Sequence, residues 1–120
     1  MRYMLLIYGD ENAGANLPPE ELQRVMDAWW GYEDWIRGTG WHREGDALQP
    51  TATATTVEFR EGESVTVDGP FAETKEQLGG YYLLDCENLD QAIEAARKMP
   101  VGPGSKVEVR PIQEFERPES

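Results

Sequence analysis

The chain has 120 residues, which we expect to form one domain over 1–120 with a single hydrophobic core. It carries 23 acidic and 11 basic residues, a formal net charge of −12, and this excess argues against nucleic acid and anionic membrane surfaces as partners. It has no run of about 18 apolar residues and no small-residue cleavage site near Met1, so we expect a soluble, cytoplasmic protein. The single cysteine, Cys86, cannot form an internal disulfide and fits a reducing compartment.

The first half of the chain predicts a strand, a helix and a loop. Residues 3–8 are all apolar or aromatic, which is typical of a strand covered on both faces. A helix is predicted from Pro18-Pro19 to Gly38, because apolar residues recur at three- and four-residue steps. This core-facing stripe comprises Leu22, Val25, Met26, Trp29, Tyr32 and Ile36. Trp30 and Trp35 flank it, where they either pack at the border or line a pocket or subunit contact. Residues 41–50 are predicted to form a loop.

The second half predicts a hairpin followed by a strand, a helix and a strand. The predicted elements are strands at 52–60 and 64–67 around a turn at 61–63, a short helical turn within 71–78, a strand at 81–86, a helix at 89–99 and a strand at 106–115. Asn88 is the predicted N-cap of the second helix. Pro111 lacks an N–H group and assigns the last strand to a sheet edge.

This order of elements predicts an α+β, ferredoxin-like split βαβ fold with an extra hairpin. The two strands without alternation, at 3–8 and 81–86, are expected to be central. Which of the middle strands pair with them stays open. Two helices cover only one face of such a sheet, so we expect a second copy of the chain to cover the other face in a homodimer.

The densest cluster of candidate site residues begins at the Asp68-Gly69-Pro70 bend. A carboxylate fixed by such a bend serves either as a positioned base or only to stabilise the turn. The only histidine, His42, either faces Asp68 to form a proton-abstracting pair or lies at the surface. One histidine and one cysteine make a poor metal set, and we expect no metal and no cofactor. Carboxylate-only binding of a hard cation stays open, although no loop signature supports it.

The run DGPFAETKEQLGGYYLLD at 68–85 resembles the signature of the DGPF branch of the YCII-related proteins. The segments RYMLLIYGDE, LQPTATATTV and VEVRPI resemble the same family, so the likeness covers nearly the whole chain. The resemblance implies a ferredoxin-like fold that pairs through its sheets as a dimeric α/β barrel. Proteins of the DGPF branch are often encoded beside extracytoplasmic-function sigma factors. Other branches, among them a chloromuconolactone dehalogenase, use a His/Asp pair whose histidine lies early in the first helix. Residues 17–22 here (LPPEEL) contain no histidine, so that pair is not carried over.

Two functional hypotheses follow. A third reading is that the chain forms a dimer in which the motif serves only the fold. The first is an enzyme acting on a small polar organic molecule near the 68–80 loop, with Asp68 as acid or base, His42 as its partner and Lys75 holding an anionic group. Further ligand-binding candidates are Tyr8, Trp30, Phe71, Glu73, Glu76 and Tyr81. The second is a non-catalytic accessory factor that binds a ligand or a protein, within a sigma-factor system. Asp68 in a cleft would favour the enzyme, and an exposed Asp68 far from any cleft would disfavour it.

Overall fold

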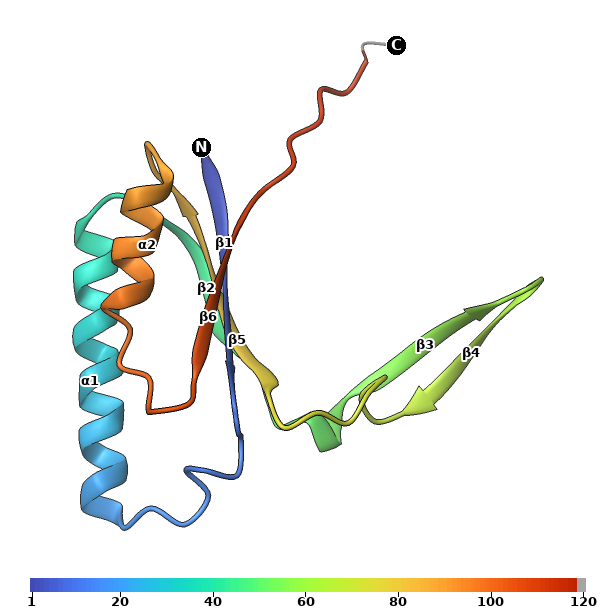
Figure 1. Ribbon diagram of the computed structural model, residues 1–120, viewed down its shortest axis with the longest axis horizontal. Coiled ribbons are helices and arrows are strands. Elements are labelled where there is room, and N and C mark those ends of the chain that lie inside the picture. The colour runs from blue at the N-terminus through green and yellow to red at the C-terminus, as the bar shows by residue number, and fades with distance from the viewer. Residues whose placement is uncertain (119–120) are drawn as a thin grey trace.

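The computed structural model describes residues 1–118 and has the expected α+β plan (Figure 1). The elements are β1 (Arg2–Gly9), α1 (Pro19–Gly38), β2 (His42–Ala47), a 3-10 turn (Thr51–Thr53), β3 (Thr55–Arg60), β4 (Glu63–Asp68), β5 (Gln77–Asp85), α2 (Leu89–Arg97) and β6 (Lys106–Pro111). The main sheet has the order β2-β5-β1-β6, with all neighbours antiparallel. This is the ferredoxin-like order, with β3 and β4 inserted as a separate two-stranded sheet.

The predicted centre and edge of the sheet are confirmed. β1 and β5, the two strands that lack polar alternation, are its central strands. β6 lies at one edge as expected, but it ends at Pro111 and not at the predicted residue 115. The Asn88 cap is also confirmed, since its side chain accepts a hydrogen bond from the Gln91 backbone N–H at 3.0 Å.

Two local predictions were wrong. Residues 41–50 are not only a loop, because His42–Ala47 form β2 and pair with β5. The segment HREGDA has no apolar alternation, so long-range pairing and not local pattern makes it a strand. Its Gly45 packs so closely that an added Cβ would lie 2.7 Å from the Tyr82 ring. The helical turn expected within 71–78 is absent, because Gln77 already begins β5 and residues 71–76 form bends.

The core lies between the sheet and the two helices. Alternate residues of the central strands point toward the helices, and those of β1 and β5 with the lowest exposure are Tyr3, Leu5, Tyr82 and Leu84. Tyr32 of α1 joins the two helices, since its hydroxyl donates a hydrogen bond to the Ala95 carbonyl at 2.8 Å. Among residues 1–118, neither helix has the length and apolar character needed to cross a membrane.

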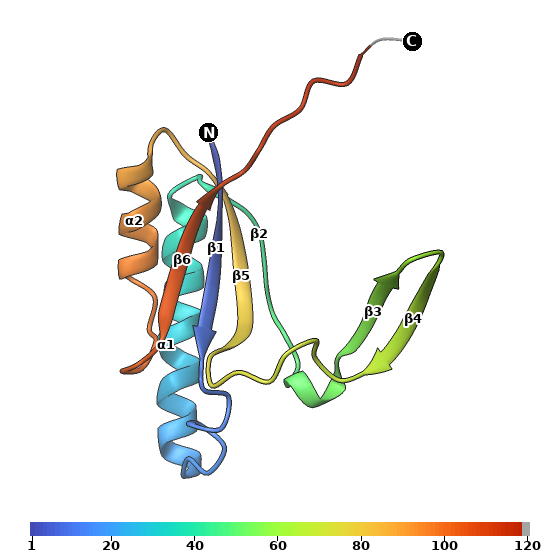
Figure 2. The same cartoon turned by 45° about the vertical axis from the view of Figure 1, so that its right-hand side comes forward.

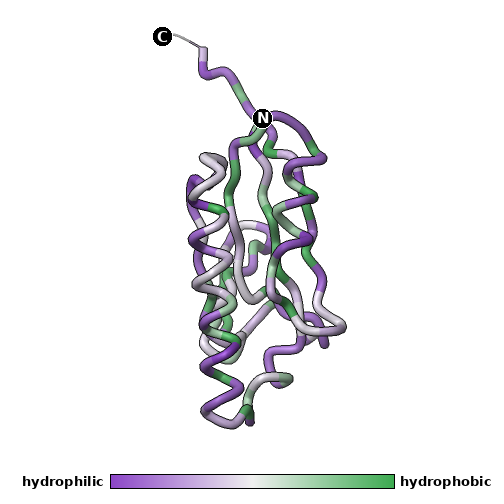
Figure 3. Tube along the Cα trace, turned by 90° about the vertical axis from the view of Figure 1, so that its left-hand side faces the viewer, coloured by the Kyte–Doolittle hydropathy of each residue, from purple (hydrophilic) through white to green (hydrophobic). Residues whose placement is uncertain are grey.

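Only the second half of the predicted α1 stripe is buried. Tyr32 and Ile36 belong to the core, whereas Leu22 is 49% exposed and Val25 and Met26 are also exposed. Figure 3 shows why, since α1 continues well past the end of α2 and its apolar residues continue with it. The prediction that the whole stripe faces the core of one chain is therefore wrong for its first two turns.

The opposite face of the sheet, here called the outer face, carries no helix (Figure 1). By the strand register it presents an apolar strip on β1 and β5, made of Met4, Leu6, Tyr8, Tyr81 and Leu83. The β3–β4 hairpin (Thr55–Asp68), here called the arm, projects away from the body on this same side (Figures 1 and 2).

Candidate functional site

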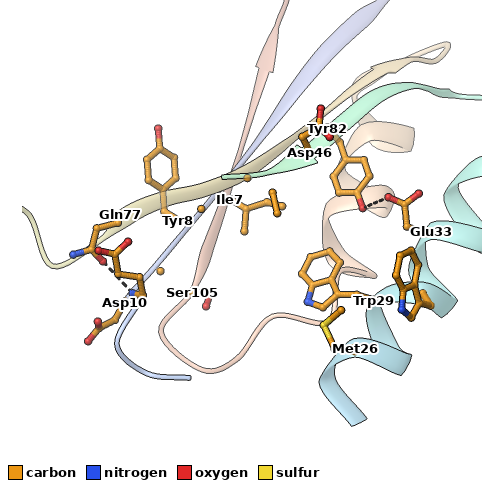
Figure 4. A pocket seen from close by; sticks show the side chains of 17 residues that line it. Ile7, Tyr8, Asp10, Met26, Trp29, Glu33, Asp46, Gln77, Tyr82 and Ser105 are labelled. Carbon is orange, nitrogen blue, oxygen red and sulfur yellow. Dashed lines mark hydrogen bonds between the residues drawn. The ribbon is translucent and has the colours of Figure 1, made fainter. Parts of the chain in front are cut away.

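A cavity of about 530 Å³ lies between the first half of α1 and the end of the sheet where β1 finishes (Figure 4). Its lining comes from β1 and the following loop, α1, β2, β5 and the segment before β6. These residues are Ile7, Tyr8, Gly9, Asp10, Glu11, Met26, Trp29, Trp30, Glu33, Gly45, Asp46, Ala47, Gln77, Gly79, Gly80, Tyr82 and Ser105. Such a volume suits a small organic molecule.

Most of the cavity wall is apolar. Ile7 points from β1 toward Met26 and Trp29 of α1, while Tyr8, the next residue, points away (Figure 4). This follows from strand alternation, because Ile7 lies on the helix-facing side and Tyr8 on the outer face. Trp29 packs edge to face on Tyr32 with ring centroids 5.8 Å apart, which fixes the indole at the border between cavity and core.

A held carboxylate, that of Glu33, lies at the inner end of the cavity. The Tyr82 hydroxyl and the Arg37 Nε each donate a hydrogen bond to it, both at 2.9 Å, on different oxygens. Burial by itself raises the pKa of Glu33, but the hydrogen bonds from Tyr82 and Arg37 outweigh it and the pKa lies below its ordinary value. Burial and the Glu33 hydrogen bond raise the pKa of Tyr82, so this pair is a neutral phenol on an ionised carboxylate at neutral pH.

The mouth of the cavity adds more acidic groups. Glu11 ties the loop after β1 to the 3-10 turn, because the Glu11 carboxylate accepts hydrogen bonds from the Thr51 backbone N–H at 3.1 Å and from the Thr51 hydroxyl at 2.6 Å. The Gln77 side chain accepts a hydrogen bond from the Glu11 backbone N–H at 3.1 Å. No lysine, arginine or histidine is among the lining residues, whereas Asp10, Glu11, Glu33 and Asp46 are. The lining therefore combines aromatic and aliphatic walls with acidic side chains, of which Glu33 is paired with Arg37 and Asp46 accepts a hydrogen bond from Tyr81 on the outer face.

Two of the residues predicted from sequence, Tyr8 and Trp30, are among the lining residues, although the Tyr8 ring points away to the outer face (Figure 4). The other candidates lie elsewhere. Asp68 ends β4 at the base of the arm and is exposed. His42 lies on β2 with its ring 5.9 Å from that of Tyr82, and its Nε2 is buried without a hydrogen-bond partner. Lys75 is exposed in the segment before β5.

The remaining candidates make surface interactions or none. Phe71 and Glu73 are exposed in the segment between β4 and β5. Glu76 forms an ion pair with Lys106. The Tyr81 hydroxyl donates a hydrogen bond to Asp46 at 3.2 Å, on the outer face. One chain therefore does not bring Asp68, His42 and Lys75 into a common cavity.

Sequence reasoning missed Glu33, Trp29 and Tyr82, which together define the inner part of the cavity. A signal for Glu33 was present. On a helical wheel it falls inside the apolar stripe, between Trp29 and Met26, where a solvated acid is out of place. The position of Tyr82 opposite it depends on strand register and could not be found from local pattern. Within residues 1–118 no group of three or more metal-ligating side chains is assembled.

Comparison with known proteins agrees with this fold and with the resemblance seen in the sequence. The model of the YCII-related domain matches residues 1–116. An uncharacterized protein from Rhizobium meliloti (strain 1021) is 40% identical over 114 residues, covering 93% of this chain and 92% of its own length. A family model that spans nearly the whole chain, together with a relative of matching length, assigns the chain to the YCII-related domain family.

Proposed function

We propose that the cavity between α1 and the sheet binds a small organic molecule that has an apolar body and a positively charged amine. The observation that carries this proposal is the lining itself, which offers indole rings and carboxylates but no basic side chain. It refines the ligand class expected from sequence, a small polar organic molecule, by giving the charge.

Two physical effects favour a cation in this cavity. An ammonium group over an indole face gains about 0.5–2 kcal/mol from the ring quadrupole, most when it is desolvated. A net charge of −12 also creates a potential that concentrates cations near the surface and repels carboxylates. An anionic ligand would meet Glu33 ionised at neutral pH, because its pKa is lowered. Lys75, which was expected to hold an anionic group, is not among the lining residues.

Whether the bound molecule is also transformed depends on an acid or base. Glu33 suits the holding of charge better than proton abstraction, since a carboxylate with a lowered pKa is a weak base. Asp68 is exposed and does not line this cavity, which disfavours the role of acid or base that the enzyme hypothesis gave it. A non-catalytic accessory factor, of the kind that works beside a sigma factor, would use the same cavity and leave its ligand unchanged.

A homodimer is part of this proposal. Besides its apolar strip, the outer face has acidic Glu44 and Asp46 along the β2 edge, while Lys106, Glu108 and Arg110 lie along the β6 edge. A two-fold axis parallel to the strands stacks the β2 edge of one sheet over the β6 edge of the other. The two acids of the β2 edge then meet an edge with two bases and one acid, whereas an axis across the strands would stack the two acids on the same two acids.

The experiment is a thermal-shift screen with ligands of the same shape and different charge, 2-phenylethylamine, 2-phenylethanol and phenylacetate. A ligand at about 100 times its dissociation constant stabilises by ~2.7 kcal/mol, a rise in Tm of roughly 8–14 °C for a chain of this size. We expect amines to stabilise, with the effect reduced in Glu33→Gln and in Trp29→Ala. Tyr81→Phe is the matched control on the outer face and should bind like wild type.

Stabilisation by phenylacetate and not by the amine would refute the proposal. For every amine that binds, NMR of the ligand over hours of incubation separates an enzyme from a binding protein, because only an enzyme changes the ligand spectrum.

A further inference from the structure

The Glu33 carboxylate at the inner end of the cavity already has a cation beside it. Arg37 lies one helical turn after Glu33, and its Nε donates a hydrogen bond to Glu33 Oε2 at 2.9 Å. The Tyr82 hydroxyl donates to the other oxygen, Oε1, also at 2.9 Å. Glu33 and Tyr82 are lining residues of the cavity, whereas Arg37 is not. Arg37 therefore neutralises, from outside the cavity, the carboxylate that the proposed amine would bind.

The two partners of Glu33 are held with different firmness. Tyr82 is 6% exposed, and its ring packs edge to face on Tyr32 with ring centroids 5.4 Å apart, so its hydroxyl is fixed in place. The Arg37 side chain is 64% exposed. An exposed ion pair between residues four apart on a helix is weak, because water screens the charges and a long side chain has to be held in one geometry. Tyr82 is thus the fixed partner and Arg37 the exchangeable one.

Leaving Glu33 costs Arg37 little. Arg37 belongs to the last turn of α1, where the partial negative charge of the helix end favours a cation. Asp34, three residues before Arg37, is exposed on the neighbouring side of the helix and offers a second carboxylate. A guanidinium also keeps its charge at every pH at which Glu33 is ionised. The Glu33 site therefore always contains a competitor for a cationic ligand, and one that can be displaced.

We propose that Arg37 is the resident counter-ion of Glu33 and that a bound amine competes with it for this carboxylate. Arg37 is then a specificity-determining residue, because only a cationic ligand can compete with a guanidinium. A neutral ligand of the same shape leaves the ion pair intact. This inference rests on the proposed function, since it needs an amine in the cavity. It deepens that function by naming a residue outside the cavity that limits the affinity for the amine.

Two arginine variants with the same change in charge test this inference. Arg37→Gln removes the counter-ion. Arg24→Gln removes a positive charge from an exposed position of the same helix, about 20 Å along its axis from Arg37 and on the side opposite Met26 and Trp30. We expect Arg37→Gln to bind 2-phenylethylamine about two- to fivefold more tightly than wild type in isothermal titration calorimetry, as the loss of an exposed ion pair implies. Arg24→Gln should bind the amine like wild type, because salt screens a charge at that distance. The affinity for 2-phenylethanol should be the same in all three proteins.

A second measurement uses the unaltered protein. The NMR signal of the Arg37 Nε–H group, assigned by its loss in Arg37→Gln, reports the hydrogen bond to Glu33. Saturation with 2-phenylethylamine should shift this signal and speed the exchange of its proton with water. Addition of 2-phenylethanol should leave the signal unchanged.

The outcomes separate this inference from the proposed function. An amine that binds without changing the Arg37 signal overturns the inference and leaves the ligand class standing. Equal or weaker amine binding in Arg37→Gln does the same, and so does an equal gain of affinity in Arg37→Gln and Arg24→Gln, which would be a general effect of net charge. If wild type and both variants bind no amine, the proposed function is wrong and this inference is wrong with it.

Discussion

The hydrogen bond between Tyr82 and Glu33 is the contact through which β5 fixes the inner carboxylate of the cavity, and its energy can be measured. The Tyr82 hydroxyl donates at 2.9 Å to a carboxylate whose side chain is only 22% exposed. A hydrogen bond to a charged group contributes about 1.5–3 kcal/mol, more than a neutral pair. We therefore expect Tyr82→Phe to lower the free energy of unfolding by about 1.5–3 kcal/mol at neutral pH.

A double-mutant cycle with Glu33→Gln isolates this contact from the loss of the Arg37 interaction. Urea unfolding of the four proteins at neutral pH should give a coupling energy of about 1–2 kcal/mol between Tyr82 and Glu33. Tyr81→Phe is the control, because its hydroxyl bonds to Asp46 on the exposed outer face. It should cost less than about 0.5 kcal/mol.

The pH dependence of the coupling energy between Tyr82 and Glu33 provides the test that could refute this assignment. The pKa of Glu33 is lowered in the folded chain, so its stabilisation is fully present above its ordinary value of 4.5. It is lost as the pH falls through the folded value, where Glu33 becomes protonated. The coupling should therefore shrink when the cycle is repeated below that value. A coupling under about 0.5 kcal/mol at neutral pH, or one that is unchanged in acid, would refute the assignment.

Three further substitutions probe the fold around the site. Leu84→Ala removes a fully buried side chain and should cost about 2–5 kcal/mol in urea unfolding, whereas Leu89→Ala, at an exposed helix position, should stay within about 0.5 kcal/mol of wild type. Asn88→Ala removes the N-cap of α2 and should cost about 1 kcal/mol, seen also as faster amide exchange in the first turn. Gly45→Ala places a Cβ 2.7 Å from the Tyr82 ring, so we expect a loss of about 1–3 kcal/mol together with weaker amine binding; an unchanged Tm would contradict the packing.

Much of the fold was predictable because its strongest elements carry local patterns. β1 and β5 read as continuous apolar runs, and a strand of that kind belongs at the centre of a sheet. The apolar stripe of α1 and the cap at Asn88 located both helices. β2 was missed because HREGDA has no strand pattern of its own and exists only through its pairing with β5. Residues 71–76 were misassigned because turn-forming charged residues resemble a helix start.

The candidate site was less predictable, for a related reason. The Asp68-Gly69-Pro70-Phe71 motif dominates the sequence, so Asp68 and Lys75 drew attention, yet in one chain both are exposed and neither lines the cavity between α1 and the sheet. The functional roles assigned to them remain predictions. Glu33 was recognisable only as an acid inside an apolar stripe, and its significance depends on Tyr82 standing opposite.

The sequence by itself determined the α+β plan, the two central strands, one edge strand and the membership of the YCII-related family, because periodicity, caps and motifs are properties of neighbouring residues. It also showed the apolar stripe of α1. Only the tertiary structure decided where that stripe ends inside the core, which residues enclose the cavity and that the threonine-rich hairpin is an arm outside the main sheet. Those features depend on register and on contacts between distant segments, which local pattern does not encode.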